Sequence, residues 1–269
     1  MKLGFSTLGC PNWGVDQIIE AARANGYDGV ELRCYRGSLD LLETLGEFLG
    51  GPAEFRRRLS RAGIEVCCLD TSVHLTETDP SAAEADRMVD LAMALRAPYL
   101  RVFGGEIPAG ESREACLAGA AQRLAQFGRR AAQRGKRVLV ETHDSFSSGA
   151  AVAALLDAAG SEGTGAVWDL HHPYRMGEPP SETAALIARR TYHAHVKDSR
   201  KYGPYTFLGE GDVPIAEIVA SLHAAGYRGY LCLEWEKLWH PELPEPGVAL
   251  PQGARYLSDL LRRLGIPRG

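Results

Sequence analysis

The chain has 269 residues, which is long enough to bury a large core in one domain. Its composition is 45% hydrophobic and 24% charged, which is ordinary for a globular protein and excludes fibrous and disordered classes. The formal net charge is −4, so the chain as a whole gives no electrostatic help to the binding of DNA or another polyanion. We therefore expect no nucleic-acid partner.

The six cysteines form no C-x-x-C pair, and most lie in apolar runs, where cysteine behaves as a small hydrophobic residue. This usage is typical of a reducing compartment. Residues 1–6 enter a strand-like run without the long apolar segment of a signal peptide, and no stretch approaches the length of a membrane span. We expect a cytoplasmic protein with no membrane partner, and homo-oligomer formation is left open.

Strand-like runs and helical patterns alternate in eight units along the chain. The predicted strands are Leu3–Thr7, Gly29–Arg33, Glu65–Asp70, Tyr99–Phe103, Val138–Thr142, Gly165–Leu170, Tyr192–Val196 and Tyr230–Trp235. The predicted helices are Val15–Asn25, Ala53–Ala62, Pro80–Arg96, Arg113–Arg134, Gly149–Ala159, Ser181–Arg190, Pro214–Ala225 and Gln252–Leu264, with apolar residues recurring at helical spacing. Eight such units predict a single-domain α/β fold, the (βα)8 or TIM barrel, over residues 1–269; roughly 250 residues are typical of this fold.

Glycines mark the predicted helix exits. Gly26 precedes the second strand and Gly226 the eighth, each in a Gly-Tyr-x-Gly pattern, and Gly63 and Gly135 precede the third and fifth. Glycine takes the left-handed conformation after a helix at little steric cost. An open doubly wound sheet is the structural alternative. That fold usually carries a Gly-rich phosphate loop after its first strand, and residues 9–12 do not form one.

The segment Lys237–Pro251 is rich in proline and contains Trp239 and His240. It follows the last predicted strand, so in a barrel it would be a loop. We consider two alternatives, a loop over the catalytic face and a loop that only packs.

Four consecutive predicted strands end in polar residues, namely Glu141, Asp169, His195 and Glu234. A carboxylate within an apolar strand is costly unless it is paired or bound to a metal, and for any one of these residues a buried ion pair is the simpler explanation. Adjacent barrel strands lie about 5 Å apart, so the four side chains would converge on a point where a cation replaces their lost hydration. Three carboxylates and one imidazole predict one divalent metal ion, Mn²⁺ first, with Mg²⁺, Co²⁺ and Zn²⁺ as alternatives.

This arrangement resembles the xylose isomerase-like barrel family, which includes sugar epimerases, hydroxypyruvate isomerases and inosose dehydratases. The resemblance covers nearly the whole chain and depends most on His195-Val196-Lys197-Asp198, on Leu-Gly-Glu-Gly-Asp-Val-Pro at residues 208–214, and on Gly226-Tyr227-x-Gly229 leading to Glu234. These are similar to the H-x-K-D, G-x-G-D, G-Y-x-G and E series of the family. The resemblance implies that Glu141, Asp169, His195 and Glu234 are the metal ligands, and that Glu141 and Glu234 also act as acid and base.

Such a centre predicts a group of related reactions on a small carbohydrate or polyol. A metal that chelates a carbonyl and its neighbouring hydroxyl acidifies the C–H between them and stabilises the enediolate that forms. Proton return on the other face gives epimerisation, return at the neighbouring carbon gives isomerisation, and loss of a β-hydroxyl gives dehydration. We predict a metal-dependent isomerase or epimerase of a small sugar or keto-sugar, phosphorylated or not, with an inosose-type dehydratase as the alternative.

His172 and Lys197 are candidates for substrate binding. In ketose epimerases of this family a histidine three residues after the strand-six aspartate contacts the substrate, and the resemblance gives His172 this role; support of Asp169 is the alternative. Lys197 shares the inward parity of His195 and would either neutralise an enediolate oxygen or pair with Glu234.

His74 and Arg200 are further candidates for substrate binding. His74 closes an extension of the third strand and would face the pocket, and Arg200 lies in the region where the similar epimerases carry an arginine. Glu31 would either bind substrate or compensate the charge of Arg33 or Arg101 inside the barrel.

Two functions of other classes remain as alternatives. An apurinic endonuclease-like phosphodiesterase on a related barrel binds three zinc ions and needs further histidines and aspartates, whereas this chain has eight histidines in all and the wrong charge for DNA. A non-catalytic binding barrel would not need the four ligands. Metal content discriminates between them: one ion per chain, three zinc ions, or none.

Overall fold

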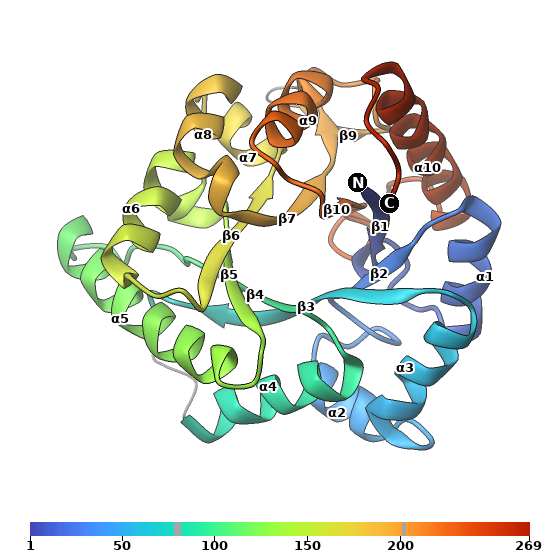
Figure 1. Cartoon of the computed structure of the whole chain (residues 1–269), viewed down its shortest axis with the longest axis horizontal. Coiled ribbons are helices and arrows are strands. Elements are labelled where there is room, and N and C mark those ends of the chain that lie inside the picture. Colours follow the sequence, from blue (N-terminus) through green and yellow to red (C-terminus); the bar gives the residue numbers. More distant parts are fainter. Residues whose placement is uncertain (78–81, 201–202) are drawn as a thin grey trace.

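The computed structural model describes residues 1–77, 82–200 and 203–269. Within these residues, eight parallel strands form a closed barrel in the order β1-β10-β7-β6-β5-β4-β3-β2 (Figure 1). The barrel strands are β1 (Lys2–Ser6), β2 (Gly29–Leu32), β3 (Glu65–His74), β4 (Tyr99–Phe103), β5 (Arg137–Glu141), β6 (Thr164–Asp169), β7 (Thr191–Val196) and β10 (Tyr230–Leu233). The fold is the single-domain (βα)8 barrel that the sequence predicts.

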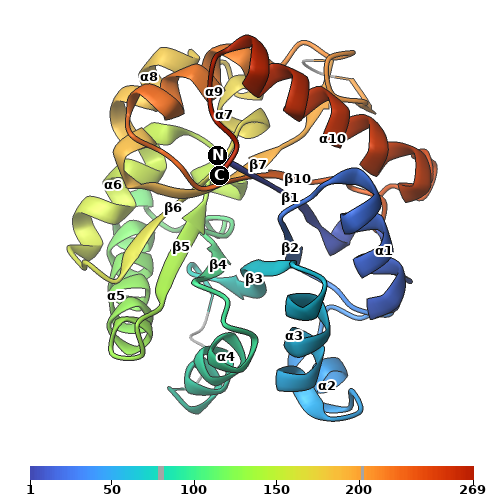
Figure 2. The ribbon, with the colours of Figure 1, turned by 45° about the vertical axis from the view of Figure 1, so that its right-hand side comes forward.

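The helices surround the barrel, and α10 packs beside α1 to complete the ring (Figures 1 and 2). Their bounds are α1 (Val15–Asn25), α2 (Leu41–Gly46), α3 (Gly51–Arg61), α4 (Ala82–Leu95), α5 (Arg113–Ala132), α6 (Gly149–Ala159), α7 (His171–Arg175), α8 (Pro180–Ile187), α9 (Ile215–Ala224) and α10 (Pro246–Arg263). Short 3-10 segments lie at η1 (Thr7–Gly9), η2 (Asp144–Phe146) and η3 (Ala188–Arg190). None of the helices in the described ranges combines the length and the apolar character needed to cross a membrane.

The predicted glycine exits are confirmed. Gly26 follows α1 in the left-handed region with φ 68°, and its N–H donates to the carbonyls of Ala22 and Arg23. Gly226 lies after α9 with φ 92°. A side chain would strain either position, because L-residues rarely adopt this conformation. The chain then turns directly into the next strand.

Predicted and observed elements agree closely, with one helix placed wrongly. All eight predicted strands are present, and α1 and α6 have the predicted bounds. The predicted start of the fourth helix at Pro80 lies outside the described residues. The last helix begins at Pro246 rather than Gln252, so part of the expected loop is helical.

The early start of α10 has a physical reason. Pro246 lies in the first turn, where a helix needs no N–H donor from it. Pro251 lies inside the helix and removes one backbone hydrogen bond, but the neighbouring Ala249 and Leu250 are buried against the barrel. Packing of this apolar face outweighs the lost bond.

Several short elements have too few residues to show a period and were not predicted. These are α2, α7, and an antiparallel pair formed by β8 (Asp198–Ser199) and β9 (Tyr205–Thr206). Helix α7 follows β6 directly, and the β8–β9 pair follows β7, so these elements lie next to the strand ends that carry the candidate site.

Candidate metal centre

The four strand-end residues lie together at the carboxyl end of the barrel. Donor atoms of Glu141, Asp169, His195 and Glu234 are all within 4.8 Å of one another. Glu141 and Asp169 end β5 and β6, His195 is the last residue but one of β7, and Glu234 directly follows β10. Each is at most 5% exposed. The parallel register produces this cluster, since Asp169 pairs with His195, and His195 with Cys232 on β10.

His195 lies at the middle of the cluster with both ring nitrogens facing carboxylates. Nε2 is 2.7 Å from Glu31 Oε2, while Nδ1 is 3.0 Å from Glu141 Oε1 and 3.6 Å from Glu234 Oε1. Burial opposes a charge on the imidazole, but these three carboxylates outweigh it and hold the pKa of His195 well above its usual range. A proton on Nδ1 thus occupies the position that a cation would take between the carboxylates. The donor set therefore fits a divalent metal.

Glu141 is held ionised by cationic neighbours. Arg101 Nε lies 3.3 Å from Glu141 Oε2, an oxygen that is buried and accepts no hydrogen bond within the described residues. Burial opposes ionisation, but His195 and Arg101 hold the pKa of Glu141 well below its usual range. A buried anionic oxygen without a hydrogen bond is costly, and a bound cation would remove that cost.

Lys197 lies against three carboxylates of the same region. Its Nζ is 2.8 Å from Asp169 Oδ2, 2.7 Å from Glu234 Oε2 and 2.8 Å from Glu236 Oε1, and the lysine is only 3% exposed. Burial opposes ionisation of Glu234, but Lys197 and His195 lower the pKa of Glu234. For Asp169 burial outweighs Lys197 and raises the pKa to about 7. Of the two roles that the sequence suggests for Lys197, pairing with Glu234 is found in the structure. Contact of Lys197 with substrate stays a prediction.

A row of rings borders the cluster. The rings follow one another with centroids 4.7–5.5 Å apart in the order His74, Phe103, His143, His172, His171, Tyr205 and His240. They come from the ends of β3 and β4, from the segments after β5 and β6, from β9, and from the loop after β10. The row includes His74, whose contact with substrate stays a prediction, and it brings His240 of the loop after β10 against Tyr205.

His172 and His171 belong to the turn of α7 but have different partners. His172 Nε2 lies 3.6 Å from Asp169 Oδ2, and it is buried without a hydrogen-bond partner in the described residues. His171 Nε2 is 2.7 Å from Ser199 Oγ. His172 therefore faces the cluster, where support of Asp169 and contact with substrate both remain open, whereas His171 ties α7 to β8.

Arg200 is the sequence candidate that the structure does not bring to the cluster. It is exposed, and its hydrogen bonds within the described residues run through its backbone carbonyl, which accepts from Ser199 Oγ and Gly203 N. A role of Arg200 in substrate binding stays a prediction.

The buried charges pair differently from the two combinations considered for Glu31. Glu31 accepts from two histidines, and Arg101 instead contacts Asp70 at 3.0 Å and Glu141. The register pairs Asp70 directly with Arg101 across β3 and β4. Sequence reasoning therefore paired Arg101 wrongly and missed Asp70 and Glu236 as site-lining residues, because these contacts depend on how the strands are placed beside one another, which no local pattern shows.

Asp198 explains why the second half of H-x-K-D and the G-x-G-D loop occur together. Its carboxylate accepts hydrogen bonds from the backbone N–H groups of Ser199, Gly209, Gly211 and Val213 at 2.8–3.2 Å. A Cβ at Gly211 would lie 2.1 Å from Asp198 Oδ1, so only glycine fits there. The motif thus folds the loop after β7 around one carboxylate.

Replacing Asp198 with alanine is expected to lower the free energy of unfolding by about 2–4 kcal/mol, because it leaves buried N–H groups without an acceptor. Urea denaturation measures this change. Asp86→Ala is the matched control, since it removes a carboxylate that forms only an exposed pair with Arg130 and should cost at most about 1 kcal/mol. Equal stability of the two variants would contradict the assigned role.

Comparison with known proteins identifies the family. Residues 19–262 match the model of a family described as xylose isomerase-like TIM barrel. No curated protein matches the chain.

Solved structures that superpose on the chain share its fold over almost the whole length. The probable 3-DHS dehydratase AsbF from Bacillus anthracis has 18% identity and a TM-score of 0.77, covering 96% of this chain and 99% of its own. The IolI protein with a bound zinc atom has 14% identity and a TM-score of 0.79, covering 98% of each chain. D-allulose 3-epimerase from Methylomonas sp. has 19% identity and a TM-score of 0.75, covering 97% and 98%. These identities establish the fold alone, but the family model spans most of the sequence, and the chain belongs to the xylose isomerase-like TIM barrel family.

Proposed function

We propose that this chain is a divalent-metal-dependent isomerase or epimerase of a small sugar or keto-sugar. The observation that supports the proposal is that oxygens of Glu141 and Glu234 lie 3.0 and 3.6 Å from the same nitrogen, His195 Nδ1, with Asp169 completing the cluster. Two carboxylates that flank one cation-binding position are suited to proton transfer on opposite sides of a bound substrate.

The four residues would hold the ion, and the surrounding side chains would set the protonation of the two carboxylates. When bound, the cation would polarise a carbonyl and its adjacent hydroxyl. Arg101 and Lys197 favour the ionised forms of Glu141 and Glu234, so either carboxylate is ready to accept a proton. His172, at the rim, would hydrogen-bond a substrate hydroxyl through its free Nε2.

The structural neighbours support the same chemistry without choosing the reaction. Two of them are named as 3-epimerases of L-ribulose and D-allulose, and another contains zinc. The neighbour named as a probable 3-DHS dehydratase makes dehydration the second candidate. Keto-sugars, inososes and cyclic hydroxy-ketones are therefore the substrates to screen, with Mn²⁺, Mg²⁺, Co²⁺ and Zn²⁺ in parallel.

A structure of the chain loaded with Mn²⁺ is expected to place an ion among Glu141, Asp169, His195 and Glu234. At least three of these side chains should lie within about 2.0–2.6 Å of the ion, which is the range of carboxylate and imidazole ligands. An ion bound elsewhere, with fewer than three of the four in contact, would remove this cluster from the mechanism.

Proton transfer predicts exchange with solvent. With an active substrate in deuterium oxide, we expect solvent deuterium at the carbon next to the carbonyl, because the carboxylate that removes the proton exchanges it before returning one. A hydride shift would retain the substrate hydrogen. Deuterium-labelled substrate in ordinary water provides the control for a shielded base that returns the same proton, since any leakage of the label to water marks proton transfer, whereas a hydride shift loses none. A new conjugated absorbance with loss of water would identify dehydration instead.

A further inference from the structure

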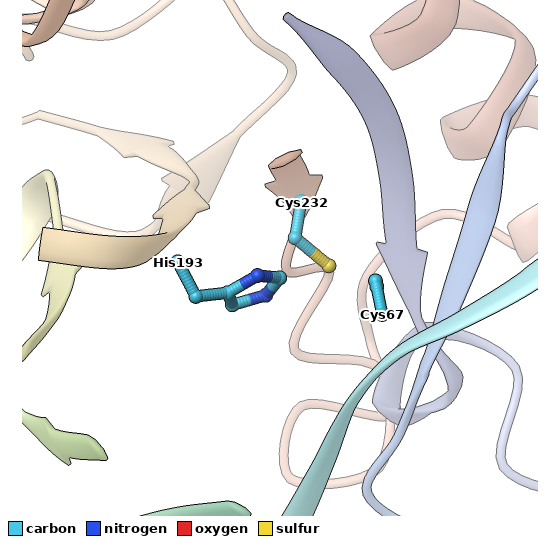
Figure 3. A group of neighbouring side chains, drawn as sticks. All are labelled: Cys67, His193 and Cys232. Atoms are coloured by element: carbon cyan, nitrogen blue, oxygen red, sulfur yellow. The ribbon is translucent and has the colours of Figure 1, made fainter. Parts of the chain in front are cut away.

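A second group of potential metal ligands lies deeper in the barrel. Cys67, His193 and Cys232 have donor atoms within 4.8 Å of one another, and each is at most 1% exposed. Figure 3 shows the imidazole of His193 beside the Cys232 sulfur, with Cys67 close to them on β3. His193 precedes His195 by two residues on β7, so this group lies about 7 Å below the centre described above.

Local features of three strands bring the group together. The register between β2 and β3 shifts at Val30 and Glu31, which pair with Val66 and Cys68. Cys67 is therefore the extra residue of a β-bulge, a device that turns a side chain away from its regular direction. On β1, which separates β2 from β10, the position level with Cys232 is Gly4. A Cβ there would lie 3.2 Å from the Tyr230 ring and 3.4 Å from Cys67 Sγ, so Gly4 packs directly beside this group.

His193 has one ring nitrogen with a free lone pair. Its Nε2 lies 2.7 Å from Glu31 Oε2, and because a carboxylate only accepts hydrogen bonds, Nε2 carries the proton. Nδ1 is then the unprotonated nitrogen, and it is buried with no hydrogen-bond partner in the described part of the chain. A carboxylate that fixes the tautomer of an imidazole through its far nitrogen is the usual support of a metal-bound histidine.

We propose that Cys67, His193 and Cys232 form a second metal site, selective for a thiophilic divalent cation of the zinc class. Two thiolates and one neutral imidazole are soft donors, in contrast to the oxygen-rich set above. Binding releases the two thiol protons, and the two thiolate charges then balance the charge of the ion, so the buried group stays neutral. This site is additional to the single ion of the proposed function and does not depend on it.

The buried position fixes how the ion enters. Because the three residues have almost no exposed surface, the ion must bind while the barrel folds, as structural zinc does. The test therefore uses the full chain, reduced, unfolded and refolded with Co²⁺, then freed of loose metal by gel filtration. A thiolate-to-cobalt charge-transfer band in the near ultraviolet is diagnostic of this group. The other cluster, which we call the upper centre, consists of Glu141, Asp169, His195 and Glu234 and contains no sulfur.

The expected result is the charge-transfer band with two cobalt ions per chain. Cys67→Ser and Cys232→Ser should each abolish the band and lose one cobalt. Cys10→Ser, which alters a cysteine buried to the same degree but outside the group, should keep both. Asp169→Asn should lose the other cobalt and keep the band, so failure of the upper centre is distinguished from failure of this one.

Three results would overturn the proposal. These are a refolded parent chain without the band, a band that persists in both cysteine variants, and a Cys67–Cys232 disulfide in peptide maps of a chain that takes up no cobalt at sulfur. If a variant does not refold, the parent chain expressed in cobalt-supplemented medium still gives the decisive spectrum.

Discussion

Glu234→Gln is expected to lower kcat by about 10²–10⁴-fold while the barrel stays folded, because the amide keeps an oxygen for the cation but cannot carry a proton. Turnover is measured at saturating metal, with circular dichroism to check the fold and metal analysis to check occupancy.

Glu236→Gln is the matched control for this variant. Glu236 lies two residues along and contacts the same Lys197 Nζ at 2.8 Å, but it does not belong to the four-residue cluster. We expect it to keep most activity. Full turnover by Glu234→Gln, or an equal loss in both variants, would exclude Glu234 as the group that transfers the proton.

The second large effect is expected for Lys197→Met in the metal-free chain. Lys197 compensates the buried carboxylates of Asp169, Glu234 and Glu236, and removal of one partner of a buried charge group typically costs about 3–5 kcal/mol. Urea denaturation should show this loss. Addition of Mn²⁺ should recover part of it, since the cation would compensate Asp169 and Glu234 in place of the ammonium group.

Lys2→Met serves as the control for Lys197→Met. Lys2 forms an ion pair with Glu65 at a similar distance of 2.8 Å, but both side chains are substantially exposed. Its loss should change the free energy of unfolding by at most about 1 kcal/mol and should not respond to metal. A Lys197→Met chain as stable as this control would show that the carboxylates do not require the ammonium group.

The sequence predicts most of the barrel because its signals are local. Apolar spacing in α9 and the glycine after α1 act within one or two helical turns, and both features are found where expected. The bounds of α10 depend on packing against the barrel, which spacing in a proline-rich segment does not show.

The candidate site also has one part that the sequence predicts and one part that it does not. Glu141, Asp169, His195 and Glu234 could be grouped because each ends its strand, and parallel strand ends meet at one face of a barrel. The partners of Arg101 and Glu31 could not be predicted. The partner of Arg101 depends on the register of β3 with β4, and the partners of Glu31 lie on β7, which β1 and β10 separate from β2 in the closed barrel. Neither relation leaves a pattern in the sequence.

The single oxygen of Glu31 that accepts from both His193 and His195 has a thermodynamic consequence. Any change that withdraws electron density from one imidazole strengthens its hold on this oxygen and weakens the hold of the other. A metal bound at the upper centre would therefore change the affinity of the Cys67, His193 and Cys232 group for its own metal. The reverse effect would have the same coupling free energy. Glu31→Gln, which removes the shared charge, would make the two binding equilibria independent, and titration of each site with the other filled or empty measures the difference.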